Sequence, residues 1–220
     1  MRTVAAKSRR ADLPRPRRTQ EARTKRSREQ ILAAALKLFS RRGYHGTSIR
    51  DIAEAARAST GNVYHQFPDK EAIFIALIEQ YLALISSPDH PFNQALIAGA
   101  FPEDLEAMGR AVRESIEKYR DHSVLVYVDA VEFDGKHLTR LFGEMADRFQ
   151  AFLTHYGPTL GLDRLRKGVS PLTAIMVVTR FFFQYFAVEV AFRVPNHFGK
   201  DSKAAIKDIV DVLKFGIIKP

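Results

Sequence analysis

The sequence predicts an all-α protein built from two helical domains. Apolar residues recur at helical spacing in almost every segment, which is the strongest of three observations. Gly and Pro separate these segments at positions where helices are expected to end. Alternating patterns typical of strands are scarce, and only the run 123–131 is ambiguous. A chain of 220 residues is long enough for such helices to bury a sizeable core.

Positive charge is concentrated at the amino-terminal end of the chain. Residues 1–80 hold 17 Lys and Arg against 8 Asp and Glu, and residues 1–30 alone hold 11 against 3. Residues 81–220 are balanced, with 17 of each sign. This asymmetry favours a polyanion as the partner of the amino-terminal end, and nucleic acid rather than an anionic membrane surface. A basic tail that is merely solvated is the alternative.

The amino-terminal part divides into a basic arm and a compact domain. Residues 1–26 are expected to be disordered, because their Arg, Lys, Pro, Ala and Thr leave little to bury. The domain is placed at residues 27–85. Its first helix is expected to begin at Ser27, a plausible N-cap, and to end at Gly43.

Two short helices and one long helix complete this domain. Thr47 or Ser48 caps a second helix, and a third helix covers about 59–66 before Pro68 stops it. Asp69 caps the long fourth helix. The buried stripe of the fourth helix is expected to contain Phe74, Leu77, Ile78, Tyr81, Leu82 and Ile85.

The remaining residues, 86–220, are expected to form a second helical domain. The stretch "SSPDHP" breaks the helical pattern at its start. Helices are expected at about 102–121, 122–133, 136–156, 170–193 and 201–218.

Three short helices that end at a sharp stop predict a helix-turn-helix motif, whose third helix lies in the major groove of DNA. The outer face of that helix must be polar, and its first residues must be small or able to hydrogen-bond. Gly61 costs helix stability of up to ~1 kcal/mol relative to Ala, which makes sense if the backbone must approach DNA closely. The residues expected to contact DNA are Thr47, Arg50, Ser59, Thr60, Gly61, Asn62, Tyr64, His65 and Lys70. Val63 and Phe67 are expected to turn inward.

The stretch "REQILAAALKLFSRRGYHGTSIRDIAEAARASTGNVYHQFPDKEAIFIALIEQY" strongly resembles the amino-terminal domain of TetR-family transcription regulators. The resemblance rests on Ile31, Leu38–Phe39, Gly43, Gly46, Thr47–Ser48, Ile52–Ala53, Ala56, Gly61, Val63–Tyr64, Phe67 and Lys70–Glu71. It covers roughly a quarter of the chain. It implies a homodimer that binds double-stranded operator DNA and that a small ligand in the carboxy-terminal domain usually releases.

Dimerisation also has a physical reason in the sequence. The segment 170–193 is apolar nearly all round, so it must be covered on two sides. We expect one cover to be the last two helices of a second subunit, which gives a homodimer with an isologous four-helix interface. The apolar stripe offered by the last helix contains Ile206, Ile209, Val210, Leu213 and Ile217. Paired recognition helices about 34–36 Å apart then read successive major grooves.

Aromatic residues are numerous in the carboxy-terminal domain. An apolar cavity for an aromatic, acyl or drug-like effector is expected there. Ordinary core packing is the alternative for each of them. The predicted ligand-binding residues are Tyr119, Tyr127, Phe133, Phe149, Phe152, Phe182 and Tyr185. The acidic cluster Asp129, Glu132, Asp134 and His137 is better explained by helix caps and ion pairs than by a metal, so no metal site and no cofactor are predicted.

The function predicted from the sequence is a cytoplasmic, ligand-released transcriptional repressor. An architectural DNA-binding protein without an effector is the alternative. An enzyme is not expected, because no G-x-S-x-G, P-loop or H-E-x-x-H motif and no cysteine is present. No membrane span is expected either, since Arg180 and Glu189 interrupt the most apolar region.

Overall fold

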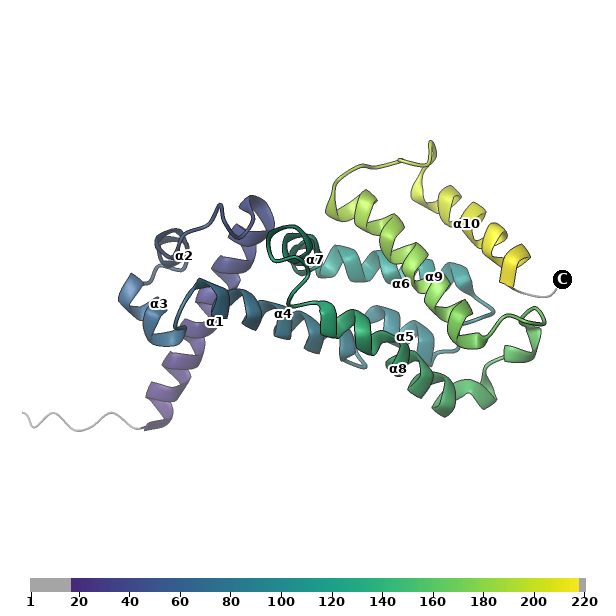
Figure 1. Ribbon diagram of the computed structural model, residues 1–220, viewed down its shortest axis with the longest axis horizontal. Helices are drawn as coiled ribbons and strands as arrows, with labels where there is room; N and C mark the ends of the chain where they lie inside the picture. Colours follow the sequence, from purple (N-terminus) through teal and green to yellow (C-terminus); the bar gives the residue numbers. More distant parts are fainter. Residues whose placement is uncertain (1–16, 218–220) are drawn as a thin grey trace, which may run out of the picture.

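The computed structural model describes residues 17–217 as an all-α fold, and no strand occurs within that range (Figure 1). The predicted fold class is confirmed, and the ambiguous run 123–131 is helical. The helices are α1 (Arg17–Arg42), α2 (Ile49–Ala55), α3 (Thr60–Gln66), α4 (Lys70–Ser86), α5 (Pro91–Ile97), α6 (Leu105–Lys118), α7 (Arg120–Glu132), α8 (Thr139–Tyr156), α9 (Pro171–Phe186) and α10 (Ser202–Ile217). Short helical turns η1 (Gly157–Thr159) and η2 (Leu162–Arg164) follow α8, and the π-helical turn η3 (Ala187–Ala191) extends α9.

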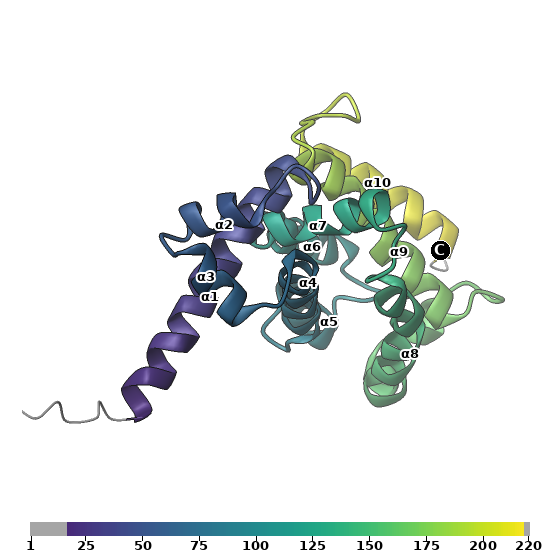
Figure 2. The ribbon, with the colours of Figure 1, turned by 60° about the vertical axis from the view of Figure 1, so that its left-hand side comes forward.

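The start of α1 differs from the sequence prediction. The helix begins at Arg17 rather than at Ser27, and its first turns project away from the rest of the molecule (Figures 1 and 2). Residues 20–26 are all exposed, but their Arg, Lys, Gln, Glu and Ala are good helix formers and extend the helix outward. The expected disorder of the arm is therefore wrong for residues 17–26, and residues 1–16 lie outside the described range.

The amino-terminal helices share a core that is completed by the second half of the chain. Ile31, Phe39 and Phe74 are fully buried where α1 meets α4. The same cluster includes Leu125 of α7 and Leu141 of α8. The chain does break at the predicted boundary, where α4 ends at Ser86, but packing continues across it. The helix-turn-helix is thus attached to α7 and α8 as well as to α4.

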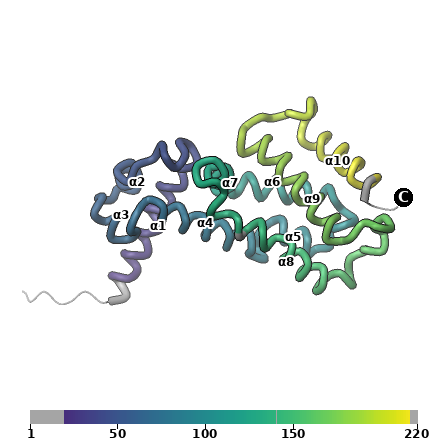
Figure 3. Tube along the Cα trace, viewed as in Figure 1, coloured from purple at the N-terminus to yellow at the C-terminus, as the bar shows by residue number. Residues whose placement is uncertain are grey.

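The carboxy-terminal core is built around α9. Phe182 and Phe186 are fully buried there, among residues from α6, α8 and α10. In the Cα trace, α9 runs between α8 and α10 (Figure 3). The predicted dimer stripe of α10 is used in this core, because Ile206, Ile209, Val210 and Leu213 pack inside their own chain. The outer side of α10 carries other apolar residues, Val212 and Phe215, which are 72% and 83% exposed.

Two stretches, 70–97 and 171–191, are long and apolar enough to cross a membrane by length and composition alone. The first is interrupted, since α4 ends at Ser86 and α5 begins at Pro91. The second contains the central helix of the core and is more than half buried within the protein. Core helices commonly pass this test, so the stretches are weak evidence for a membrane.

Candidate nucleic-acid interface and ligand cavity

Helix α3 is anchored to the protein on one side only. Ser59 caps it by accepting a hydrogen bond from the Asn62 backbone N–H at 3.1 Å. Val63 and Phe67 are buried, as predicted, and the Arg28 guanidinium of α1 lies 4.1 Å from the centre of the Phe67 ring. Arg28 also donates to the Gln66 carbonyl oxygen at 3.2 Å. The inner face and the carboxy-terminal end of α3 are therefore fixed by α1.

The opposite face of α3 is exposed and polar. Thr60, Gly61, Tyr64 and His65 are all exposed, and their spacing places them on one face of the helix. Tyr64 is 57% exposed, which is unusual for so large an aromatic side chain on a short helix. Arg50 on α2 is exposed as well. This surface leaves hydrogen-bonding groups, an aromatic ring and a cation exposed.

The surroundings of Gly61 do not require a glycine. A Cβ atom built there would meet only the Ser59 hydroxyl oxygen, at 3.9 Å, and the residue lies in an ordinary helix. Gly43 is different, because its φ is +75° and a Cβ would overlap the Glu132 carboxylate. The protein itself thus explains the glycine at 43 but not the one at 61.

Besides Ser59, whose hydroxyl caps α3, three predicted DNA contacts have partners within the protein. Thr47 is 1% exposed, and its hydroxyl donates to the Gly43 carbonyl oxygen at 2.9 Å. Asn62 directs its side-chain N–H to the Ser27 hydroxyl of α1 at 2.9 Å. Sequence reasoning placed Asn62 outward because its partner lies on another helix, whereas Thr47 bonds within the loop that follows α1.

Lys70 is the third of these residues. Its ammonium donates to the carbonyl oxygens of Tyr44 and Thr47, each at 2.8 Å, and lies 4.1 Å from the centre of the Tyr44 ring. Burial lowers its pKa. The ammonium therefore holds the loop between α1 and α2 against α4, and only the backbone N–H groups of this helix start remain for an outside anion.

A polar junction that the sequence did not reveal joins the helix-turn-helix to the carboxy-terminal half. The Glu132 carboxylate at the end of α7 accepts hydrogen bonds from the backbone N–H groups of Tyr44 at 3.0 Å and His45 at 2.6 Å. Phe133 packs beside it on the rings of Tyr44 and Phe74, 4.5 and 4.8 Å away between ring centres. No sequence signal could have paired residues 87 or 88 positions apart.

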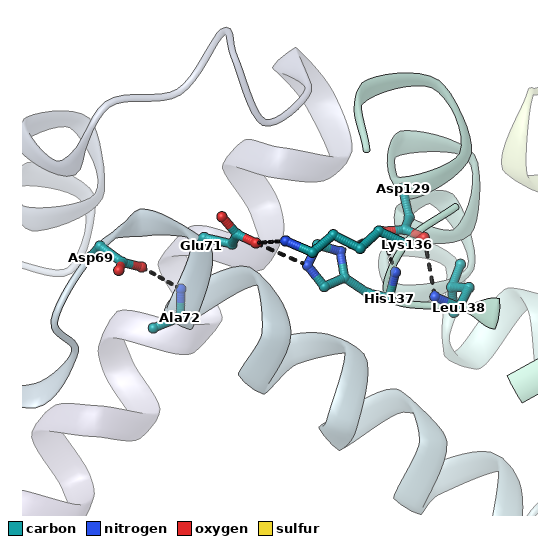
Figure 4. Close-up of polar contacts among 7 residues, drawn as sticks. All are labelled: Asp69, Glu71, Ala72, Asp129, Lys136, His137 and Leu138. Atoms are coloured by element: carbon teal, nitrogen blue, oxygen red, sulfur yellow. Dashed lines mark hydrogen bonds and ion pairs between the residues drawn. The ribbon is translucent and has the colours of Figure 1, made fainter. Parts of the chain in front are cut away.

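The second half of the junction connects α7 to the start of α4 (Figure 4). Asp129 is fully buried and contacts the Nδ1 atom of His137 at 2.6 Å, while its second oxygen accepts the Leu138 backbone N–H at 3.2 Å. Glu71 of α4 meets His137 Nε2 at 3.3 Å and Lys136 Nζ at 2.7 Å. These residues pair with one another, and no group of side chains suited to a metal ion occurs among the described residues.

A cavity of about 540 Å³ lies between α4, α5, α7, α8 and α9. Three of the predicted ligand residues line it, namely Tyr127, Phe149 and Phe152. Its walls are mostly apolar, with a few polar groups, which is the usual composition of a small-molecule site. Sequence reasoning missed the polar lining residues His90, Arg148, Thr179, Arg180 and Gln184, because it searched for aromatic side chains alone.

The other four predicted ligand residues lie elsewhere. Tyr119 stacks on the ring of His90 with 5.4 Å between ring centres, Phe133 belongs to the junction and Phe182 is fully buried in the core. Tyr185 donates to Glu189 at 3.0 Å, and burial together with that carboxylate raises its pKa to about 12. Aromatic composition alone could not separate the cavity lining from the core.

Comparison with known proteins explains the arrangement of the first four helices. Residues 31–77 match the family model described as bacterial regulatory proteins, tetR family. The match covers α2, α3 and parts of α1 and α4.

Residues 31–77 form an amino-terminal domain of the TetR family.

The curated relatives match this chain over only part of its length. The chain is 38% identical to the HTH-type transcriptional regulator RutR of Escherichia coli K12 over 95 residues, which are 43% of this chain and 42% of RutR. It is 41% identical to the HTH-type transcriptional repressor AcnR of Corynebacterium efficiens over 54 residues, 24% of this chain and 29% of AcnR. The chain thus spans less than half the length of the curated relatives it matches.

Solved structures extend the likeness to the whole fold. A tetR-family transcriptional regulator from Mesorhizobium loti matches with a TM-score of 0.59 and 22% identity, covering 89% of this chain and 98% of that structure. At this identity the likeness concerns the fold: an amino-terminal helix-turn-helix followed by a helical carboxy-terminal domain. The family and its relatives are regulators rather than enzymes.

Proposed function

We propose that this protein is a sequence-specific transcriptional regulator of the cytoplasm that reads operator DNA with the exposed face of α3. The face consists of Thr60, Gly61, Tyr64 and His65, and Arg50 extends it onto α2. Its anchoring through Val63 and Phe67 leaves every one of these side chains available to a partner. The excess of positive charge in the amino-terminal 80 residues attracts the phosphates of DNA to the same end of the molecule.

Gly61 is the single observation that most supports DNA reading. Nothing in the protein occupies the space of a missing side chain there, although Ala would favour the helix. A glycine on an exposed helical face is useful when another molecule must come close to the backbone. If α3 lies in the major groove, DNA is the molecule that approaches the backbone at Gly61.

Dimerisation through α9 and α10 completes the proposal. Val177 and Phe181 on α9 are 44% and 40% exposed, and Val212 and Phe215 on α10 are more exposed still. Such apolar side chains along two helices are what an isologous helical interface requires. A dimer would present two copies of α3 to successive major grooves.

Ligand control is proposed to act through the junction. Helix α7 lines the cavity with Ser123, Val126 and Tyr127, and its last turn carries Glu132, which holds the loop before α2. Helix α4 lines the same cavity with Tyr81 and begins at Lys70 beside α3. A ligand that fits the cavity better in one arrangement of α4 and α7 shifts the protein toward it. We propose that this arrangement separates the reading helices and releases the operator, so that the protein acts as a repressor.

The cavity favours this regulator over an architectural DNA-binding protein without an effector. A largely apolar space of about 540 Å³ is unnecessary for a protein that only compacts DNA. An architectural protein would also bind random and specific sequences with similar affinity.

Recovery of bound genomic fragments, followed by fluorescence anisotropy titrations, tests the proposal. Arg50→Ala and Tyr64→Ala should each weaken binding to a recovered fragment about 10-fold or more, as removal of a DNA-contacting side chain does. Arg110→Ala is the matched control, because Arg110 is also an exposed helical arginine but lies on α6. The proposal is wrong if all three variants bind like the parent protein, or if random DNA binds as tightly as the recovered fragment.

A further inference from the structure

The charges around the cavity are all of one sign. Arg148 of α8 and Arg180 of α9 line it, and none of its lining residues is Asp or Glu. Both arginines are exposed, and neither forms an ion pair with a carboxylate among the described residues. Arg180 does lie 5.9 Å from the centre of the Phe142 ring, another lining residue. Two exposed cations that no described carboxylate neutralises thus line this mostly apolar cavity, and they define its mouth.

The interior of the cavity holds polar atoms that lack partners. The Nδ1 atom of His90 and the hydroxyl oxygen of Thr179 are buried, and neither has a hydrogen-bond partner within the described part of the protein. Both residues line the cavity. Because an unsatisfied buried polar atom is costly, these two atoms indicate a site that a ligand completes.

His90 also defines which kind of polar group fits the interior. Burial, with a smaller contribution from Lys118, lowers its pKa to about 4, so the imidazole is neutral at physiological pH. A neutral imidazole and a hydroxyl suit an uncharged polar group or a passing apolar chain. A full negative charge is better placed at the solvated arginines, where its desolvation is small.

We propose that the effector of this regulator is an organic acid with an apolar acyl or aromatic body, whose anionic head pairs with Arg148 and Arg180. The body lies among Phe149, Phe152 and Tyr127. The volume of the cavity accommodates a molecule of drug-like size. The regulatory role of this acid rests on the proposed function, but binding of the acid itself can be measured without DNA.

The test uses probes that share a body and differ in the head group. Decanoate, decanamide and decylamine form one set, and 4-phenylbutanoate with 4-phenylbutanamide forms a second. Isothermal titration calorimetry on the full chain measures each dissociation constant. We expect at least one acid to bind at least ~10-fold more tightly than its amide, as one charge-assisted contact provides, and we expect decylamine to bind least.

Variants at the mouth connect this preference to the two cations. The double variant Arg148→Gln with Arg180→Gln should bring the acid-to-amide ratio close to one, and circular dichroism should show unchanged helicity because both side chains are exposed. Arg110→Gln on α6 removes a comparable exposed charge and should leave the ratio unchanged. Equal binding of amide or amine, a ratio that survives the double variant, or no acid binding up to millimolar concentration would each overturn the inference.

A parallel DNA titration separates this inference from the proposed function. Acid binding with the expected selectivity, together with no specific DNA binding, would disprove the regulator and leave the ligand class standing. Specific DNA binding with no preference for acids would disprove the ligand class alone.

Discussion

Replacement of Glu132 by Ala tests the junction that connects the helix-turn-helix to α7. The carboxylate accepts two backbone hydrogen bonds from the loop after α1, and its side chain is only 18% exposed. Glu132→Ala leaves both N–H groups without that acceptor. Glu132→Gln removes the charge and keeps one acceptor oxygen, so only one of the two hydrogen bonds can remain.

The expected magnitude follows from the exposure of the two donors. A hydrogen bond to a charged group contributes roughly 1.5–3 kcal/mol. The Tyr44 N–H is partly buried and loses most of that amount, whereas the His45 N–H is exposed and can bind water instead. We therefore expect Glu132→Ala to lower the free energy of unfolding by about 2–3 kcal/mol, and Glu132→Gln to lower it by about 1 kcal/mol.

Urea unfolding followed by circular dichroism measures this change, with Glu114→Ala as the matched control. Glu114 is an exposed helical glutamate on α6, where a surface substitution should change stability by less than about 0.5 kcal/mol. DNA affinity measured by anisotropy should fall in Glu132→Ala as well, because the loop before α2 is released. If Glu132→Ala matches the control in both stability and DNA affinity, the junction does not hold the helix-turn-helix in place.

Further substitutions test the reading face, the cavity and the arm. Gly61→Ala should raise the free energy of unfolding by up to ~1 kcal/mol while weakening DNA binding, because the new methyl group clashes only with the partner; tighter or unchanged DNA binding would contradict the assigned face. Thr179→Val should raise the melting temperature of the unliganded protein in calorimetry, since it removes an unpartnered buried hydroxyl at similar volume; a lower melting temperature would show that the hydroxyl is satisfied. Deletion of residues 1–26 should flatten the plot of log affinity against log salt by ~0.9 for each phosphate that the arm neutralises, and an identical slope would show that the basic arm neutralises none.

The sequence predicted local features well, because they depend on neighbouring residues. Thr47 or Ser48 was expected to cap α2 and Asp69 to cap α4, and Ser48 and Asp69 do so. Val63 and Phe67 were expected to anchor α3 and are buried. The exposed face of α3 follows from the same helical periodicity. Each of these features can be derived within a window of a few residues.

Features that depend on distant partners could not be derived in the same way. Lys70 and Asn62 look like outward polar groups until Tyr44, Thr47 and Ser27 are brought next to them. The role of Phe133 in the junction, rather than in the cavity, depends on the packing of α7 against α1. The extension of α1 ahead of Ser27 reflects helix propensity, since residues 20–26 are exposed, and a search for apolar stripes overlooks it.

Hydroxyl-radical footprinting of the full chain on a recovered genomic fragment tests the central claim most directly. A dimer that reads DNA with two copies of α3 should protect two segments on one face of the duplex, whose centres are separated by about one helical turn or a multiple of it. Tyr64→Ala changes only the exposed face of α3, and it should weaken the protection of both segments together. A single or continuous protected region, or a footprint that Tyr64→Ala leaves intact, would contradict the account.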